Sequence, residues 1–91
     1  MAKYSAAQAK AAMRFLPHWT RKGSVISRTF QFRDFATALE FVKAVAALAE
    51  KAAHHPDIDI RYNKVTLALT THDEGGLTEI DFDMAAKFDQ L

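Results

Sequence analysis

The spacing of apolar residues changes along the 91-residue chain, and each change predicts a different element. Over residues 5–16 the apolar positions recur every three or four residues, which predicts a helix that Pro17 ends. Gln8 follows Ser5 by the separation that a capping box requires at the first turn of a helix. The first predicted element is therefore an amphipathic helix.

Apolar and polar residues then alternate with the period of two that a strand with one buried face shows. We expect a short strand at 18–20, a turn at 21–23 in which glycine supplies a positive φ, and a longer strand over 25–32. Arg28 falls on the apolar phase of the longer strand. This position suits a long cationic side chain near an edge of the sheet, with its stem packed and its head in water.

A second, longer helix is predicted to begin after Asp34, a good N-cap residue, and to run to about Ala53. Two alternating segments, 58–62 and 65–70, then flank a turn at 63–64, which predicts an antiparallel hairpin. The expected apolar stripe of the long helix follows helical spacing and consists of Phe35, Leu39, Val42, Val45, Ala46 and Ala49.

The last predicted element is a helix capped by Thr78. Leu77 and Phe82 are spaced for the hydrophobic staple across that cap, and Asp81 stands at the N3 position of a capping box. The resulting order, α-β-β-α-β-β-α, contains no β-α-β unit that would oblige parallel strands. The sequence therefore predicts a single α+β domain over residues 1–91, with a four-stranded antiparallel sheet and its helices packed on one face.

Composition narrows the classes of function. Hydrophobic residues make up 49% of the chain and charged residues 25%, as in a folded globular domain. The net charge of +1, without a basic block, argues against a nucleic-acid partner held through its phosphates. No cysteine is present for disulfides or thiol chemistry, and no apolar run reaches the roughly 20 residues of a membrane span. We expect a cytoplasmic protein without a membrane partner.

Three of the four histidines stand at predicted element ends, where catalytic side chains are often displayed. His54 and His55 close the long helix, because Pro56 disfavours helical backbone at the residue before it. His72 is expected at the end of the last strand, on the same phase as Thr70. Histidine both gives and takes a proton near neutral pH. Convergence of His54, His55 and His72 on one pocket would suit a reaction made of proton transfers.

Four further polar residues could belong to such a pocket. Glu50 lies one helical turn before His54, where it could orient that imidazole, bind a substrate donor or remain a solvated carboxylate. Asp81 could serve the pocket or only cap its helix. Thr70 and Thr71 could present hydroxyl and backbone groups to a heterocycle, or only pack within a strand.

The histidine spacing does not predict a metal site. The backbone is expected to bend between His54 and His55, so the two rings cannot easily ligate one ion. Neither H-x-x-x-H nor H-x-H is present, and the glycine loops typical of nucleotide sites are absent as well. We therefore expect no metal ligand among these residues.

Several motifs closely resemble, in order and separation, those of the pterin-4a-carbinolamine dehydratase family. The resemblance covers nearly all of the chain, and an ordered set of segments is far more specific than a lone His-His-Pro. The matching residues are Glu50–Asp57, Tyr62–Val65, Thr70–Asp73, Gly76–Thr78 and Asp81, and upstream Trp19, Gly23 and Phe30–Phe35.

This resemblance implies dehydration of a 4a-hydroxytetrahydropterin to a quinonoid dihydropterin, which recycles the cofactor of aromatic amino-acid hydroxylases. It implies acid and base duties for His54 and His72, a role for His55 in holding the pterin, and a position for Glu50 facing the pterin. No electron moves in this reaction, so no cofactor is implied and the pterin is the substrate. The other expected substrate contacts are Thr70, Thr71 and Asp81.

The resemblance also bears on partners. The family forms dimers and tetramers, and a domain this small buries only about 60–65% of its unfolded surface, so we expect a homodimer or homotetramer. The alternative to catalysis is that the chain is an interaction protein. Animal members act as dimerisation cofactors of a homeodomain transcription factor, and some bacterial relatives with a degraded site resemble RuBisCO assembly factors. The intact His54, His55 and His72 favour catalysis and leave room for a second role.

Overall fold

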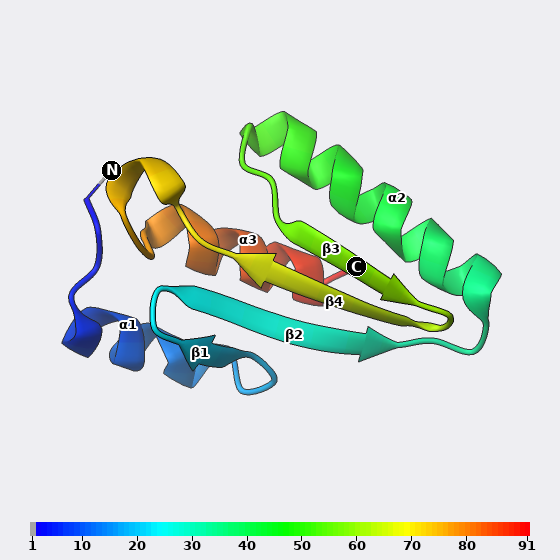
Figure 1. Ribbon diagram of the computed structural model, residues 1–91, viewed down its shortest axis with the longest axis horizontal. Coiled ribbons are helices and arrows are strands. Elements are labelled where there is room, and N and C mark those ends of the chain that lie inside the picture. Colours follow the sequence, from blue (N-terminus) through cyan, green and yellow to red (C-terminus); the bar gives the residue numbers. More distant parts are fainter. Residues whose placement is uncertain (1) are drawn as a thin grey trace.

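The computed structural model describes residues 2–91 and has the predicted order of helices and strands (Figure 1). The helices are α1 (Ala6–Ala12), α2 (Phe35–Ala52) and α3 (Glu79–Asp89), with short 3₁₀ turns η1 (Met13–Phe15) and η2 (His72–Glu74). The strands are β1 (Thr20–Lys22), β2 (Val25–Gln31), β3 (Asp57–Arg61) and β4 (Lys64–Leu69). Within the described residues, no helix is both long and apolar enough to cross a membrane.

The strands form one antiparallel sheet in the order β1-β2-β4-β3. In β4, Val65, Leu67 and Leu69 are buried, whereas Thr66 and Ala68 between them are partly exposed. The buried strand residues belong to one hydrophobic cluster with residues of α1, α2 and α3. The helices therefore cover one face of the sheet, which confirms the predicted α+β architecture.

Both predicted capping boxes are present. Ser5 Oγ accepts a hydrogen bond from the Gln8 backbone N–H at 3.1 Å, and Gln8 Oε1 accepts one from the Ser5 N–H at 2.7 Å. Thr78 and Asp81 form the corresponding pair at the start of α3. The first helix is shorter than predicted, because it tightens into η1 after Ala12.

Two turns lie elsewhere than the sequence suggests. β1 occupies Thr20–Lys22, later than the predicted strand, and the chain reverses at Gly23, whose φ is 62°. The β3–β4 turn lies at Tyr62 and Asn63, just before its predicted position, and Tyr62 has a φ of 53°. The Asn63 side-chain amide donates a 2.8 Å hydrogen bond to the Phe32 carbonyl, a contact across the fold that local turn rules do not include.

Arg28 lies in β2 one residue beyond the part that pairs with β1, so β4 is its only strand neighbour, as predicted for a position near an edge, but its head is bonded within the protein. The Arg28 guanidinium lies 4.2 Å from the ring centroid of Phe30 and 2.7 Å from a carboxylate oxygen of Asp89 in α3. Asp89 also accepts a 2.9 Å hydrogen bond from the Trp19 indole. A carboxylate and an aromatic face, instead of bulk water, therefore stabilise the charge of Arg28.

The apolar stripe of α2 is rotated from the predicted one. Phe35, predicted to start the stripe, is 46% exposed. Phe41, which the prediction omits, is buried with its ring centroid 4.6 Å from that of Phe30 and 4.9 Å from that of Phe32. Packing of this large aromatic ring sets the face that α2 turns toward the sheet. The buried residues of α2 are Ala38, Phe41, Val45 and Ala49.

Candidate active site

The three histidines selected from the sequence line one cavity of 290 Å³. The cavity lies where the end of α2 meets the segment that follows β4. The structure therefore brings His54, His55 and His72 together, although they come from two separate segments of the chain. The other lining residues are Ala53, Thr70, Thr71 and Asp73.

A left-handed residue ends α2 immediately before the two adjacent histidines. Ala53 has a φ of 52°, and its N–H donates to the Glu50 carbonyl at 3.2 Å. The His54 N–H donates to the Ala49 carbonyl at 3.1 Å, which completes the hydrogen bonds of a Schellman motif. The chain then continues through Pro56 into β3. This turn moves the histidines off the axis of α2, so helical spacing no longer decides their neighbours.

His54 is held by a buried carboxylate from α3. Its Nε2 lies 2.6 Å from Asp81 Oδ1, the His54 side chain is 14% exposed, and Asp81 is fully buried. Asp81 Oδ2 accepts hydrogen bonds from the Thr71 hydroxyl at 2.7 Å and from the Thr78 backbone N–H at 3.0 Å. An ionised Asp81 accepts hydrogen bonds at both oxygens. This pattern assigns a proton to His54 Nε2 and leaves Nδ1 as the second functional nitrogen.

His55 also bonds to a carboxylate, but at the surface. Its Nε2 forms a hydrogen bond with Glu50 Oε2, and the two side chains are 61% and 76% exposed. Of the roles considered for Glu50, orientation of His54 is not observed, because α2 ends at Ala52 and the turn that follows directs the His54 ring to Asp81. Glu50 supports the neighbouring histidine instead.

His72 opens the 3₁₀ turn η2 and does not end a strand, because β4 stops at Leu69. Thr71 and Gly76 pair across the loop through two backbone hydrogen bonds, of 3.1 and 3.2 Å, and Gly75 has a φ of 75°. The pairing closes a short loop that displays the exposed His72 at the cavity.

Thr70 and Thr71 line the cavity, yet their hydroxyl groups are bonded within the protein. Thr71 donates to Asp81, so the hydrogen shared over 2.9 Å between Thr71 and Thr78 comes from the Thr78 hydroxyl. Thr70 donates to the Ser24 carbonyl at 2.6 Å. Thr78 is the member of this network that the sequence analysis does not select. Its capping-box partnership with Asp81 is the signal that could have indicated it.

Comparison with known proteins shows the family of the chain. The model of the family described as pterin 4 alpha carbinolamine dehydratase matches residues 2–91. The chain belongs to this family. A Roseiflexus sp. (strain RS-1) protein, provisionally named a pterin-4-alpha-carbinolamine dehydratase, is 59% identical over 76 residues, which cover 84% of this chain and 82% of the relative. A Chloroflexus aurantiacus (strain J-10-fl) protein with the same provisional name is 52% identical over 91 residues, covering 100% and 98%.

Two solved structures of pterin dehydratase relatives extend the comparison. A Brucella melitensis protein described as a transcriptional coactivator/pterin dehydratase is 38% identical, with a TM-score of 0.92 and coverage of 97% of this chain and 96% of that chain. A pterin dehydratase-like protein described as a RuBisCO assembly factor in the alpha-carboxysome is 27% identical, with a TM-score of 0.67 and coverage of 79% and 83%. Relatives of the dehydratase family therefore differ in their described roles.

The chemistry that this family member offers is proton transfer. Two of its imidazoles each bond to a carboxylate, one buried and one exposed, and all three histidines line the same cavity. Within residues 2–91, no group of three His, Cys, Asp or Glu side chains is arranged to hold a metal ion. The geometry therefore places groups that can give or take a proton around a cavity.

Proposed function

We propose that the protein removes water from a 4a-hydroxytetrahydropterin and so returns the cofactor of aromatic amino-acid hydroxylases to a form ready for reduction. The observation that carries this proposal is the cavity lined by three histidines, of which His54 is backed by the fully buried Asp81. Membership of the pterin carbinolamine dehydratase family supports the same reaction.

The reaction needs one proton delivered and one proton removed. The hydroxyl on C4a is protonated and leaves as water when the C4a–O bond breaks. N5 loses its proton as the double bond between C4a and N5 forms. The products are water and a quinonoid dihydropterin, with no oxidation or reduction. One general acid and one general base suffice, and each contributes typically about 10²–10⁴-fold in rate.

His54 suits the base in this scheme. A buried carboxylate on Nε2 stabilises the imidazolium that forms when Nδ1 takes up a proton. Asp81 keeps its orientation, because two further hydrogen bonds hold its second oxygen. We assign the acid that protonates the leaving hydroxyl to His72, which its loop displays at the cavity. His55, supported by Glu50, is assigned to holding the pterin ring.

A turnover assay tests the proposed function. The carbinolamine is generated by a pterin-dependent hydroxylase and mixed with wild-type protein or with the His54→Ala, His72→Ala double variant, and dihydropterin formation is followed by absorbance. Wild-type protein should accelerate dehydration well above the spontaneous rate, and the double variant should lose nearly all of this acceleration. Circular dichroism checks that the variant is folded, because His54 bonds to a buried carboxylate. Near-wild-type turnover by the folded double variant would contradict the proposal.

A chelator distinguishes proton transfer from metal catalysis at the same site. The proposed scheme assigns each proton to an imidazole and requires no metal or other cofactor. EDTA should therefore leave turnover unchanged, as measured in the same absorbance assay. Loss of turnover with EDTA, followed by recovery when zinc is added, would replace this scheme with a metal-dependent one.

A second candidate role, association with protein partners, is favoured by the exposed edge of the sheet. β3 is an edge strand, and the apolar residues Ile58, Ile60 and Tyr62 in and after it are exposed. An exposed apolar edge is typical of an association surface. The Brucella relative, described as both coactivator and dehydratase, supports a protein that combines the two roles.

We propose that copies of the chain associate into a homodimer or homotetramer through this edge. Sedimentation at micromolar concentration should give a mass above that of the monomer, and Ile58→Lys, Ile60→Lys should lower it. A strictly monomeric wild-type protein would argue against self-association. A pull-down with the wild type and the histidine double variant then separates partner binding from turnover.

A further inference from the structure

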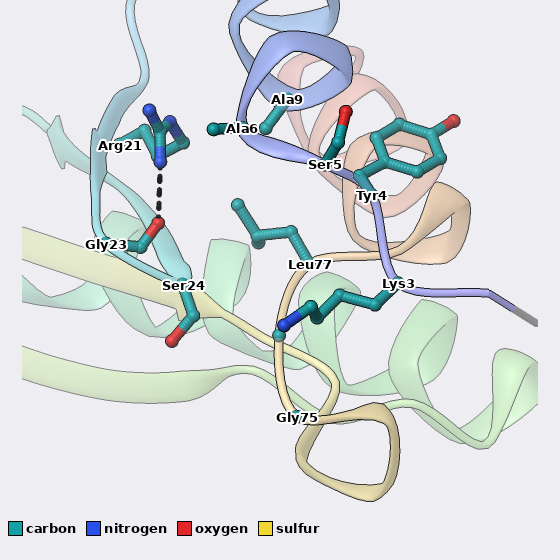
Figure 2. Close-up of a pocket in the computed structure, with 11 residues that line it drawn as sticks. Lys3, Tyr4, Ser5, Ala6, Ala9, Arg21, Gly23, Ser24, Gly75 and Leu77 are labelled. Atoms are coloured by element: carbon teal, nitrogen blue, oxygen red, sulfur yellow. Dashed lines mark hydrogen bonds between the residues drawn. The ribbon is translucent and has the colours of Figure 1, made fainter.

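A second cavity, of 360 Å³, lies apart from the histidines (Figure 2). Its walls come from the N-terminal segment with the first turns of α1, from the β1–β2 turn, and from the loop Gly75–Leu77 that precedes α3. Among residues 2–91, this cavity and the candidate active site share no lining residue. The second cavity is therefore separate from the candidate active site and is lined by different residues.

Two cations face this cavity. Figure 2 shows the Lys3 side chain crossing the Gly75–Leu77 loop, with Arg21 on another wall. The Arg21 guanidinium donates a 2.9 Å hydrogen bond to the Gly23 carbonyl, which orients it and leaves its other N–H groups available. In the described part of the chain, neither cation forms an ion pair, and no aspartate or glutamate lines the cavity. The described residues that line the cavity therefore leave its positive charge without a neutralising partner.

The N-terminal segment that carries Lys3 is anchored. The Tyr4 N–H donates a 2.7 Å hydrogen bond to the Leu77 carbonyl, and the Tyr4 ring stacks on Phe82 with centroids 5.3 Å apart. The aliphatic stem of Lys3 lies against Gly76, where an added Cβ would come within 2.8 Å of Lys3 Cδ. Glycine at this position makes room for the stem. Lys3 is therefore held at the cavity by its neighbours.

The rest of the lining provides hydroxyl groups and an apolar floor. Ser5 Oγ accepts a hydrogen bond from the Gln8 N–H and so keeps its own hydrogen to donate. Ser24 contributes a second hydroxyl, and Ala9 and Leu77 are buried apolar residues in the wall. A ligand with an anionic group and an apolar part would match these surfaces.

We propose that this cavity binds a small organic anion, whose phosphate or carboxylate group lies between Lys3 and Arg21 and whose apolar part contacts Ala9 and Leu77. Arginine and lysine form charge-assisted hydrogen bonds with either oxyanion, and these bonds are about twice as strong as neutral ones. The proposal is independent of the dehydratase reaction, so binding is its readout.

Titration of ¹⁵N-labelled full-length protein with phenyl phosphate and with benzoate, at constant ionic strength, tests the proposal. At least one of them should produce saturable amide shifts at residues 3–6, 21–24 and 75–77. Lys3→Gln and Arg21→Gln should each weaken binding by about tenfold or more, because each removes a hydrogen bond to a charged group. Lys10→Gln and Lys22→Gln remove the same charge outside the lining and should leave the affinity unchanged.

The two probes distinguish the sources of the oxyanion. Saturation by phenyl phosphate alone assigns a phosphate ester, saturation by benzoate alone assigns a carboxylate, and saturation by both supports the shared chemistry. Absence of saturable shifts with both probes overturns the proposal. Equal weakening by the Lys10→Gln and Lys22→Gln controls also overturns it, because binding would then reflect net charge and not this cavity.

Discussion

His54 and His55 are neighbours in the sequence, and each bonds to a carboxylate through Nε2, yet the two pairs lie in opposite environments. The first pair is buried, and its carboxylate comes from α3. The second pair lies at the surface, and its carboxylate comes from the same helix that the histidines follow. Both histidines follow the left-handed Ala53, so the different directions of two adjacent side chains separate these environments.

The comparison shows that the same combination of histidine and carboxylate suits different purposes when its burial differs. Asp81 is fixed by Thr71 and Thr78, so its charge acts on His54 from one direction, and both side chains have little exposure to solvent. Glu50 and His55 are exposed, and solvent screens their interaction. The buried pair suits a step that requires a fixed proton position. The exposed pair suits a contact that adapts to a ligand.

Alanine substitutions at the two histidines should give the largest difference. His54→Ala should lower kcat by about 10²–10⁴-fold, because it removes a proposed general base. His55→Ala should mainly raise KM, because its proposed role is to hold the pterin. Steady-state kinetics on folded variants measure both values. Equal losses of kcat in the two variants would mean that the difference in burial between His54 and His55 does not give them different roles in catalysis.

The two carboxylates should differ strongly in their effect on stability. Asp81→Ala leaves donors on three buried or partly buried residues without this acceptor, and breaking a buried pair costs about 3–5 kcal/mol. Glu50→Ala should change the free energy of unfolding by less than about 1 kcal/mol, because the pair is exposed. Urea denaturation of each variant gives these values. Similar losses in both variants would show that the contrast in burial has no energetic consequence.

Asp89 lies at the opposite end of α3 from Asp81, and its substitution should lower stability without affecting catalysis. Its carboxylate accepts hydrogen bonds from Arg28 and from the Trp19 indole. Asp89→Ala should lower the free energy of unfolding by about 1.5–3 kcal/mol, because hydrogen bonds to a charged group are lost. At a temperature where the variant remains folded, kcat should stay at the wild-type value. A fall in kcat of the folded Asp89→Ala variant at that temperature would contradict this separation.

The sequence predicts the features of the fold that depend on local rules. Capping boxes at Ser5 and Thr78, the end of the long helix before Pro56 and the order of elements all follow from residues a few positions apart. The convergence of the histidines is predicted too, because His54 and His72 lie near element ends. In these cases tertiary contacts agree with local preference.

Contacts between distant segments, and one unusual backbone conformation, account for the errors. The prediction for Glu50 assumes that α2 continues through His54, whereas a left-handed Ala53 ends it, a conformation that is uncommon for alanine. The bond between His54 and Asp81 joins two elements through the packing of α3, which no local pattern contains. The ion pair between Arg28 and Asp89 likewise joins β2 to the end of α3, and for this reason the sequence alone places the head of Arg28 in water.

Asp34, at the N-terminal end of α2, provides the smallest and most specific test of how a carboxylate acts without burial. Hydrogen bonds from the Thr37 side chain and backbone lower the pKa of Asp34 below its ordinary value of 3.8. Because the folded-state pKa is depressed, the stability that the charge contributes is present above pH 3.8 and is lost as the pH falls below it through the folded-state value. Asp34→Asn keeps an equally good N-cap but removes the charge. Urea denaturation should therefore show wild type more stable than Asp34→Asn at neutral pH, with the difference shrinking in acid. A difference that stays constant with pH would mean that the cap acts through hydrogen-bond geometry alone. Of the three carboxylates Asp34, Glu50 and Asp81, only the buried Asp81 would then stabilise the fold through its charge.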